Sequence, residues 1–263
     1  MSPKKRNIFT RILIWRYKHI SEHQFVLVLS IFVGFLAGLG TVILKYITLL
    51  IQSILEDGII KNVHYLLYFI FPIIGVWLVY LIKKNFIKKE IGHGISTTLY
   101  SISKRSGIIE RYKMFASLIT APITVGFGGS AGLQGPAVST GAALGSNVAQ
   151  LFHMNSKTRM LLIGCATAGA MSSMFKAPVA AIVFAIEISS LDLVFASFVP
   201  LLLASISAVI TSYFFRGTDV LFGFELQEAW RVRDIFFYVF LGIATGIASV
   251  SYTHLTLPTI YSV

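Results

Sequence analysis

The chain has 263 residues, of which 56% are hydrophobic and only 13% are charged. This apolar content excludes an ordinary soluble domain and predicts an all-α integral membrane protein. The net charge of +11 does not indicate nucleic-acid binding, because the basic residues flank apolar segments and so follow the pattern of membrane topology. We therefore expect a lipid bilayer, and no nucleic acid, as a partner.

Eight apolar segments follow one another along the chain. They cover residues 25–55, 65–82, 114–125, 137–152, 160–175, 177–188, 193–215 and 235–250. A helix needs ~20 residues to cross the hydrocarbon core, so the first segment is long enough to cross with tilt, while several others are too short to cross alone. Short segments are typical of tilted and broken transmembrane helices that turn back near the middle of the bilayer.

The basic residues predict the orientation of the chain. Residues 1–24 hold six of them and are expected to form a cytoplasmic, interfacial amphipathic helix. Four lysines follow the second apolar segment, whereas the loop before that segment carries Glu56, Asp57 and only Lys61. This asymmetry places the N-terminus in the cytoplasm of a multi-pass protein of the plasma membrane.

The two ends of the sequence differ from its middle. We assign residues 25–250 to one membrane domain. From Ser251 onward the residues change in character, so we interpret 251–263 as a non-native tail and leave it out of the fold prediction. The alternative is a genuine short extracellular or cytoplasmic tail.

A glycine-rich loop without charges, Gly126–Pro136, precedes a predicted helix over Ala137–Phe152. Irregular backbone is tolerated at membrane depth only where it lines a cavity or binds something. The N–H groups of the first helical turn would face the loop, and a helix N-terminus carries about half a positive charge. The loop therefore predicts a small anion as ligand. No metal and no other cofactor is expected.

A second loop, Gly92–Ser96, precedes a predicted helical run over Thr97–Ser103, so two helix N-termini are expected to converge on one anion. The predicted anion-binding residues are His93, Gly94, Ile95, Leu133, Gln134 and Gly135. The predicted supporting residues of the two loops are Gly92, Ser96, Gly128, Gly129, Ser130, Gly132 and Pro136.

Four motifs in this order resemble the CLC family of chloride channels and proton-coupled chloride transporters. They are Gly92-His93-Gly94-Ile95-Ser96, Gly128-Gly129-Ser130-Ala131-Gly132-Leu133-Gln134-Gly135-Pro136, Gly141-Ala142-Ala143-Leu144-Gly145-Ser146, and Phe175-Lys176-Ala177-Pro178 leading to Phe184-Ala185-Ile186-Glu187. The resemblance implies two inverted repeats and a homodimer with a pathway for chloride or another monovalent anion in each subunit. It covers the first repeat and the start of the second.

Two departures from the family pattern bear on mechanism. The resemblance places Gln134 where the family has a gating glutamate, and Ile188 where coupled transporters have an inner proton-transfer glutamate. An amide cannot ionise, so Gln134 is expected to act as a permanently open gate and the transport to be passive. The alternative is that Gln134 is an engineered or sequencing substitution for a native glutamate.

Three further departures concern the surroundings of the anion. By resemblance His93 stands where chloride-preferring members have serine, and it either contacts the anion or has a structural role at a helix start. Ser96 replaces a proline. Lys176 replaces an asparagine and is expected to face an aqueous vestibule, where it would attract anions.

Two other functions remain open alongside anion permeation. One is a broken-helix secondary transporter that binds a carboxylate solute at similar helix ends. The other is an inactive fragment that needs a second repeat. We do not expect an enzyme, because the sequence has no HExxH, P-loop lysine or nucleophile-and-base pattern.

Overall fold

The computed structural model describes residues 21–58, 69–89, 91–92, 94–189, 195–217 and 231–260. These residues form helices and their connections, with no strand among them, so the predicted all-α class is confirmed. The chain divides into two compact units, Met1–Leu221 and Phe222–Val263. Residues 1–20, which hold most of the predicted amphipathic helix, lie outside the described residues.

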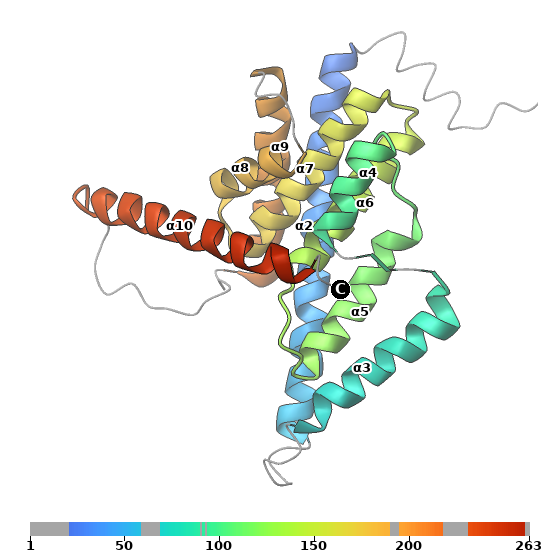
Figure 1. Cartoon of the computed structure of the whole chain (residues 1–263). Helices are drawn as coiled ribbons and strands as arrows, with labels where there is room; N and C mark the ends of the chain where they lie inside the picture. Colours follow the sequence, from blue (N-terminus) through green and yellow to red (C-terminus); the bar gives the residue numbers. More distant parts are fainter. Residues whose placement is uncertain are drawn as a thin grey trace, which may run out of the picture. The chain divides into compact units, whose positions relative to one another are not determined.

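Figure 1 shows the helices of the first unit in chain order. They are α2 (Glu22–Gly58), α3 (Phe71–Ile82), the π-helical turn η3 (Lys83–Ile87), α4 (Ile95–Lys104), α5 (Tyr112–Gly126), α6 (Gln134–Leu151), α7 (Ser156–Phe175), α8 (Pro178–Ser189) and α9 (Phe195–Arg216). The described helix of the second unit is α10 (Asp234–Ile260). The predicted segments agree with these helices, apart from shifts at their ends.

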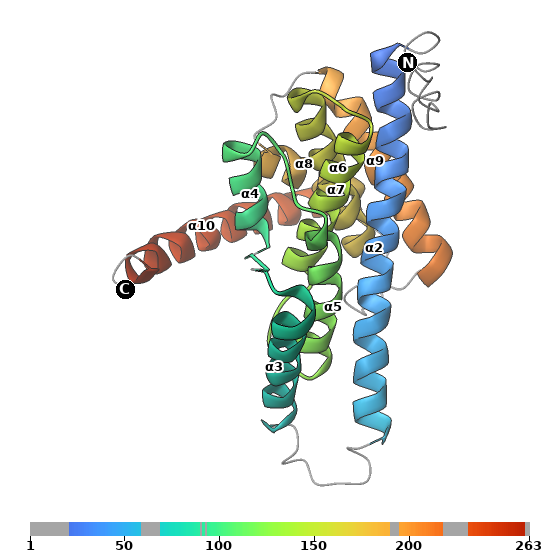
Figure 2. The ribbon, with the colours of Figure 1, turned by 90° about the vertical axis from the view of Figure 1, so that its right-hand side faces the viewer.

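The long helix α2 packs against α5, α6, α7 and α9, and Figure 2 shows it running along the side of this group. Small residues allow the closest approach. A Cβ atom on Gly38 would lie 2.9 Å from the Cα of Ala208 in α9, and one on Gly34 would overlap the backbone of Ala204. Close backbone contact of this kind drives helix association in membranes.

Gly141 and Gly145 allow α6 and α7 to pack closely. A Cβ on Gly141 would lie 2.8 Å from the carbonyl oxygen of Ala166, and one on Gly145 would overlap the backbone of Leu162. Gly128 and Gly132 are also four residues apart, but they lie in the connection between α5 and α6 and make no helix–helix contact of this kind.

Helix lengths confirm the mixture of long and short membrane segments. Among the described residues, three helical stretches are long and apolar enough to cross a bilayer: Glu22–Glu56, Ser197–Arg216 and Asp234–Tyr252. By contrast, the 12 residues of α8 extend only about 18 Å at 1.5 Å per residue. This is well short of the ~30 Å hydrocarbon core, so α8 has the length of a half-helix.

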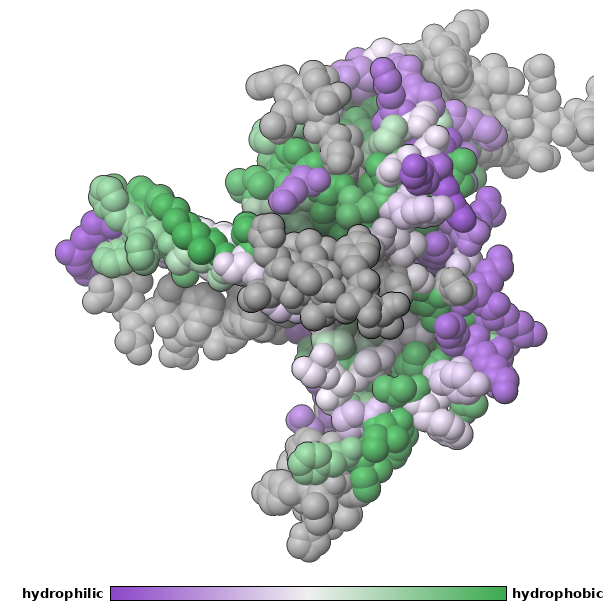
Figure 3. All heavy atoms as spheres, viewed as in Figure 1, coloured by the Kyte–Doolittle hydropathy of each residue, from purple (hydrophilic) through white to green (hydrophobic). Residues whose placement is uncertain are grey.

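The surface of α3 is that of a helix in lipid. Ile73, Val76 and Trp77 are each more than half exposed, and hydrophobic colour covers the body of the helix in Figure 3. Hydrophilic residues gather at its end, over η3, where Lys83 and Lys84 are exposed. An apolar helix with a lysine-rich end is typical of a membrane boundary.

The helix α10 continues to Ile260, beyond the Val250 boundary predicted for the membrane domain. The helical structure therefore includes most of the segment that the sequence set aside as a tail. The non-native origin of residues 251–263 stays a prediction.

Candidate functional site

The first residues of α4 and α6 lie in contact. Gly94 is the residue before α4, with φ +54, and a Cβ built on it would lie 3.4 Å from the Cα, carbonyl carbon and carbonyl oxygen of Gly135. L-residues with a side chain rarely adopt such a φ. Glycine at position 94 therefore permits the turn into α4. The starts of α4 and α6 lie side by side, as the sequence predicted, and the anion between them stays a prediction.

The start of α6 differs from the sequence prediction. The helix begins at Gln134, so Gln134, Gly135 and Pro136 form its first turn instead of the preceding loop. The N–H of Ala137 already donates to the carbonyl of Leu133 over 3.0 Å. Since proline has no N–H, the donors of this turn that lack an acceptor within the helix are those of Gln134 and Gly135.

The side of Gly135 that would carry a side chain is open. Among the described residues, nothing lies within 4 Å of a Cβ built on Gly135. The side chain of Gln134 is exposed, and its Oε1 would lie 3.9 Å from a Cβ on Gly132. The first turn of α6 thus combines N–H groups, the positive end of a helix and open space, which together suit an anion.

The helix α4 begins at Ile95, two residues before the predicted start at Thr97. Ile95 and Ser96 therefore belong to its first turn, whose N–H groups have no acceptor within the helix. A Cβ on Gly92 would overlap the side chain of Thr97, so glycine is required there as well. His93 lies outside the described residues.

The connection from α5 to α6 is held by backbone contacts. Gly128 has φ +84, and the N–H of Gly129 donates to the carbonyl of Thr124 over 2.9 Å. Ser130 and Gly132 are exposed. The predicted loop residues therefore shape the entrance to α6, while the helix itself supplies the donors nearest Gly94.

The helix α4 also packs against α8. At the far end of α8, Glu187 is exposed and Ile188 is partly buried. The start of α8 is tied to α9, because Ser205 Oγ donates to the carbonyl of Pro178 over 3.0 Å. The two residues on which passive transport was predicted, Gln134 and Ile188, thus stand at the start of α6 and at the end of α8.

A cavity of about 270 Å³ lies beside Leu133, the residue before α6. Its lining includes Lys45, Thr48 and Gln52 of α2, and Arg216 at the end of α9. We did not predict Lys45 as a site residue. The signal is nevertheless present, because this lysine is the lone Asp, Glu, Lys or Arg between Gln24 and Leu55, and an ionisable residue in a membrane helix is commonly functional.

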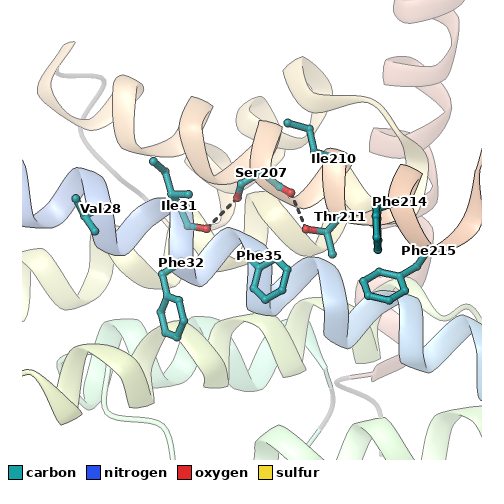
Figure 4. Close-up of a pocket in the computed structure, with 9 residues that line it drawn as sticks. All are labelled: Val28, Ile31, Phe32, Phe35, Ser207, Ile210, Thr211, Phe214 and Phe215. Atoms are coloured by element: carbon teal, nitrogen blue, oxygen red, sulfur yellow. Dashed lines mark hydrogen bonds between the residues drawn. The ribbon is translucent and has the colours of Figure 1, made fainter.

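A larger groove of about 550 Å³ runs between α2 and α9 and is apolar (Figure 4). Its two hydroxyl groups are turned to the backbone: Ser207 Oγ donates to the carbonyl of Ile31 over 3.0 Å, and Thr211 Oγ1 donates to that of Ser207 over 2.8 Å. The remaining lining is aliphatic and aromatic, including Phe32 and Phe214. Such a groove offers an anion no donors.

The sequence also matches the model of a known protein family. The model of the family described as voltage gated chloride channel matches residues 73–260. The chain belongs to this CLC family. The chloride channel protein CLC-e of Arabidopsis thaliana is 24% identical over 245 residues, which cover 85% of this chain and 34% of that protein. The H+/Cl− exchange transporter 5 of Homo sapiens is 26% identical over 207 residues, covering 75% of this chain and 25% of that protein.

Solved CLC structures share the fold. A CLC-type fluoride/proton antiporter matches with a TM-score of 0.65 at 23% identity, over 86% of this chain and 56% of that one. A slow cyanobacterial Cl−/H+ antiporter matches with a TM-score of 0.66 at 19% identity, over 85% of this chain and 54% of that one. The CLC chain described here therefore spans about half the length of these structures, and about a quarter to a third of the two curated relatives.

Proposed function

We propose that this CLC protein provides a membrane pathway for a small inorganic anion such as chloride, and that the starts of α4 and α6 bind the ion. The contact between Gly94 and Gly135 carries the proposal. Two helix N-termini directed at one place offer N–H donors and partial positive charge, which offset the loss of the ion's hydration. The residues of this contact carry no fixed cation that would trap the ion.

We propose further that transport is passive. Gln134 has an amide at the start of α6, where the resemblance to the family leads us to expect a carboxylate, and Ile188 has an aliphatic side chain at the end of α8. Neither group can carry a proton. Several relatives are named as exchangers or antiporters, which couple chloride or fluoride to protons. The proposal of passive transport therefore depends on Gln134 and Ile188 of this chain.

The proposal also covers the assembly, the orientation and the membrane of the whole protein. The family resemblance favours a homodimer with one pathway in each subunit. The distribution of basic residues favours a cytoplasmic N-terminus in the plasma membrane.

Chloride efflux from proteoliposomes tests the function, with valinomycin to carry compensating potassium and a pH-sensitive dye to follow protons. We expect chloride efflux without coupled proton movement. Gln134→Glu should lower efflux at pH 7, because a carboxyl group of ordinary pKa, ~4.3, is ionised there and competes with the anion. Efflux of this variant should recover as the pH approaches 4. Gln134→Asn is the control and should show no such recovery.

Proton movement driven uphill by chloride in the unmodified chain would contradict passive transport. Binding is measured separately by comparing melting temperatures in sodium chloride and sodium gluconate at equal ionic strength. A ligand at 100 times its Kd stabilises the folded state by about 2.7 kcal/mol. Stabilisation by chloride without efflux indicates that conduction needs more of the protein. Stabilisation by acetate or succinate but not by chloride would favour a carboxylate transporter, and no response to any anion would refute the proposal.

A further inference from the structure

We propose that the lysine-rich end of α3 binds the headgroup of an anionic phospholipid. The residues that carry the charge, here called the lysine cluster, are Lys83, Lys84, Lys88 and Lys89. Together with Tyr80 they line a hollow of about 520 Å³. This volume is far larger than the ~30 Å³ that one water molecule occupies in the liquid, so a phosphate group fits with water around it. The proposal goes beyond anion permeation and does not depend on it.

The backbone after α3 gathers the four lysines. Lys83 and Lys84 begin the π-helical turn η3, and the N–H of Lys88 donates to the carbonyl of Lys83 over 2.8 Å. Lys88 has φ 52, a left-handed conformation that ends the helix. The chain turns at this residue, so the last two lysines line the same hollow as the first two. The fold therefore presents four ammonium groups to one ligand.

The lysine cluster lacks negative partners in the part of the chain that the structure describes. No carboxylate among these residues lines the hollow, and the recorded ion pair joins Arg105 and Glu110 on another segment. Residues 83–90 have a net charge of +3, from the four lysines and Glu90, which lies outside the described residues. A phosphate group would offset this charge.

Two aromatic rings stand beside the lysine cluster. Lys84 Nζ lies 6.0 Å from the ring centroid of Tyr80, and Lys89 Nζ lies 5.1 Å from that of Tyr112 at the start of α5. Such contacts attract an ammonium group to the ring face. A ring does not neutralise the charge, so both lysines can still attract a phosphate.

The exposed face of α3 leads directly to the lysine cluster. The opposite face is turned to α5, since Gly75 is buried and a Cβ on it would lie 2.7 Å from the Cβ of Phe127. Trp77, Tyr80 and Lys84 are all exposed and follow at intervals of three and four residues, so they share one face. Trp and Tyr are enriched at membrane interfaces. An acyl chain can therefore lie along this face while its headgroup meets the lysines.

The spacing along α3 matches the depth of a phospholipid. At 1.5 Å per residue, Lys84 lies about 6 Å beyond Tyr80 and about 10 Å beyond Trp77. The headgroup region on each side of the hydrocarbon core is roughly 5–8 Å thick. With Tyr80 at the edge of the hydrocarbon, Lys84 stands among the phosphates and Trp77 beside the acyl chains. A soluble anion would use the charge alone, whereas a phospholipid uses both the charge and the apolar face.

Diffuse attraction of a basic segment to an anionic membrane is the competing explanation. It depends on the number of positive charges near the surface and not on their arrangement. Arg111 and Lys113 provide a matched comparison. They flank Tyr112, whose ring contacts Lys89, yet neither lines the hollow. Removing two charges at 111 and 113 tests diffuse attraction, and removing two at 83 and 84 tests the site.

The experiment measures lipid binding beside Trp77 and does not need transport. In the full chain, Trp15→Phe and Trp230→Phe leave Trp77 as the sole tryptophan. This chain is placed in phosphatidylcholine bilayers that contain a fraction of phosphatidylglycerol with brominated acyl chains. Bromine quenches the tryptophan fluorescence at contact. Brominated phosphatidylcholine at the same fraction is the reference, so the two quenching curves give the preference for one headgroup over the other.

We expect phosphatidylglycerol to be preferred at least tenfold beside Trp77, since each lysine near a membrane surface contributes about fivefold in binding. Lys83→Gln combined with Lys84→Gln should lower the preference at least fivefold. Arg111→Gln combined with Lys113→Gln should lower it less than about twofold. Lys83→Arg combined with Lys84→Arg should preserve it, because the charge stays.

An equal loss in the two glutamine pairs would assign the effect to diffuse attraction and overturn the proposal. Equal quenching by the two lipids in the chain with native lysines would overturn it as well. A rise in melting temperature in sodium phosphate over sodium gluconate at equal ionic strength, without a preference for phosphatidylglycerol, would assign the hollow to a soluble phosphate instead. If the chain with both lysines replaced does not fold, Lys84→Gln alone decides the question, since this side chain is exposed.

Discussion

Two regions of this molecule suit a negative group by different physical means. Where α4 and α6 begin, glycines bring two backbones together, and the N–H groups and helix ends supply partial charge. At the end of α3, the lysine cluster supplies whole charges from side chains. Anion binding in the first region should depend on backbone geometry within a few tenths of an ångström. Anion binding in the second should depend on net charge and ionic strength. The first arrangement suits a small ion that must leave again, and the second suits a headgroup held at the membrane surface.

The largest expected effect is at Gly94. Gly94→Ala forces a residue with a side chain to adopt φ +54 with ψ −115, at a cost of about 1–3 kcal/mol. Because relief of this backbone strain would change the turn into α4, we expect chloride efflux to fall at least tenfold and chloride to lose its stabilising effect. Efflux and melting temperature in chloride and gluconate measure both changes.

Gly135→Ala is the matched control for stability. A Cβ at this position meets nothing within 4 Å, and alanine favours helical backbone, so the melting temperature in gluconate should stay the same or rise. If the anion occupies the space beside Gly135, Gly135→Ala should also reduce the increase in melting temperature that chloride causes. Identical behaviour of the alanine variants at 94 and 135 would show that the contact between the two helix starts has no special role.

The next largest effect is the dependence on ionic strength, which should differ between lipid binding at the lysine cluster and chloride efflux. The Debye length shortens from ~30 Å at 0.01 M salt to ~3 Å at 1 M. The preference for phosphatidylglycerol beside Trp77 should therefore fall several-fold between low ionic strength and 1 M sodium gluconate. The effect of Gly94→Ala on chloride efflux should be the same in both, since it acts through backbone position. A lipid preference that persists unchanged at 1 M would show that the charge of the lysines does not hold the lipid.

The sequence predicted the first region as a binding site and the second only as a mark of orientation. Glycines with positive φ or close backbone neighbours, such as Gly94, Gly128 and Gly145, leave a readable pattern because no other residue fits. The start of α6 was placed three residues too late, since a glycine and a proline in the first helical turn resemble a loop. Lys45 was overlooked because its hydrogen bond to Met174, and its place with Arg216 in the lining of one cavity, join residues that are far apart in the chain.

The smallest expected effect on transport concerns the far end of α4. Ser146 Oγ accepts a hydrogen bond from the N–H of Ile109 over 3.0 Å and donates to the carbonyl of Gly107 over 2.6 Å. These bonds tie the turn after α4 to α6. Ser146→Ala leaves both buried groups without this partner and should lower the free energy of unfolding by about 1–3 kcal/mol.

The effect of Ser146→Ala on chloride efflux should be limited to about twofold, because Gly94 at the opposite end of α4 keeps its own contact with α6. Ser103→Ala, at an exposed position of the same helix, is the control and should change neither quantity. A loss of chloride response in Ser146→Ala as large as that in Gly94→Ala would mean that α4 moves as a rigid unit. The local backbone geometry at Gly94 would then be less important than the anchoring of the whole helix.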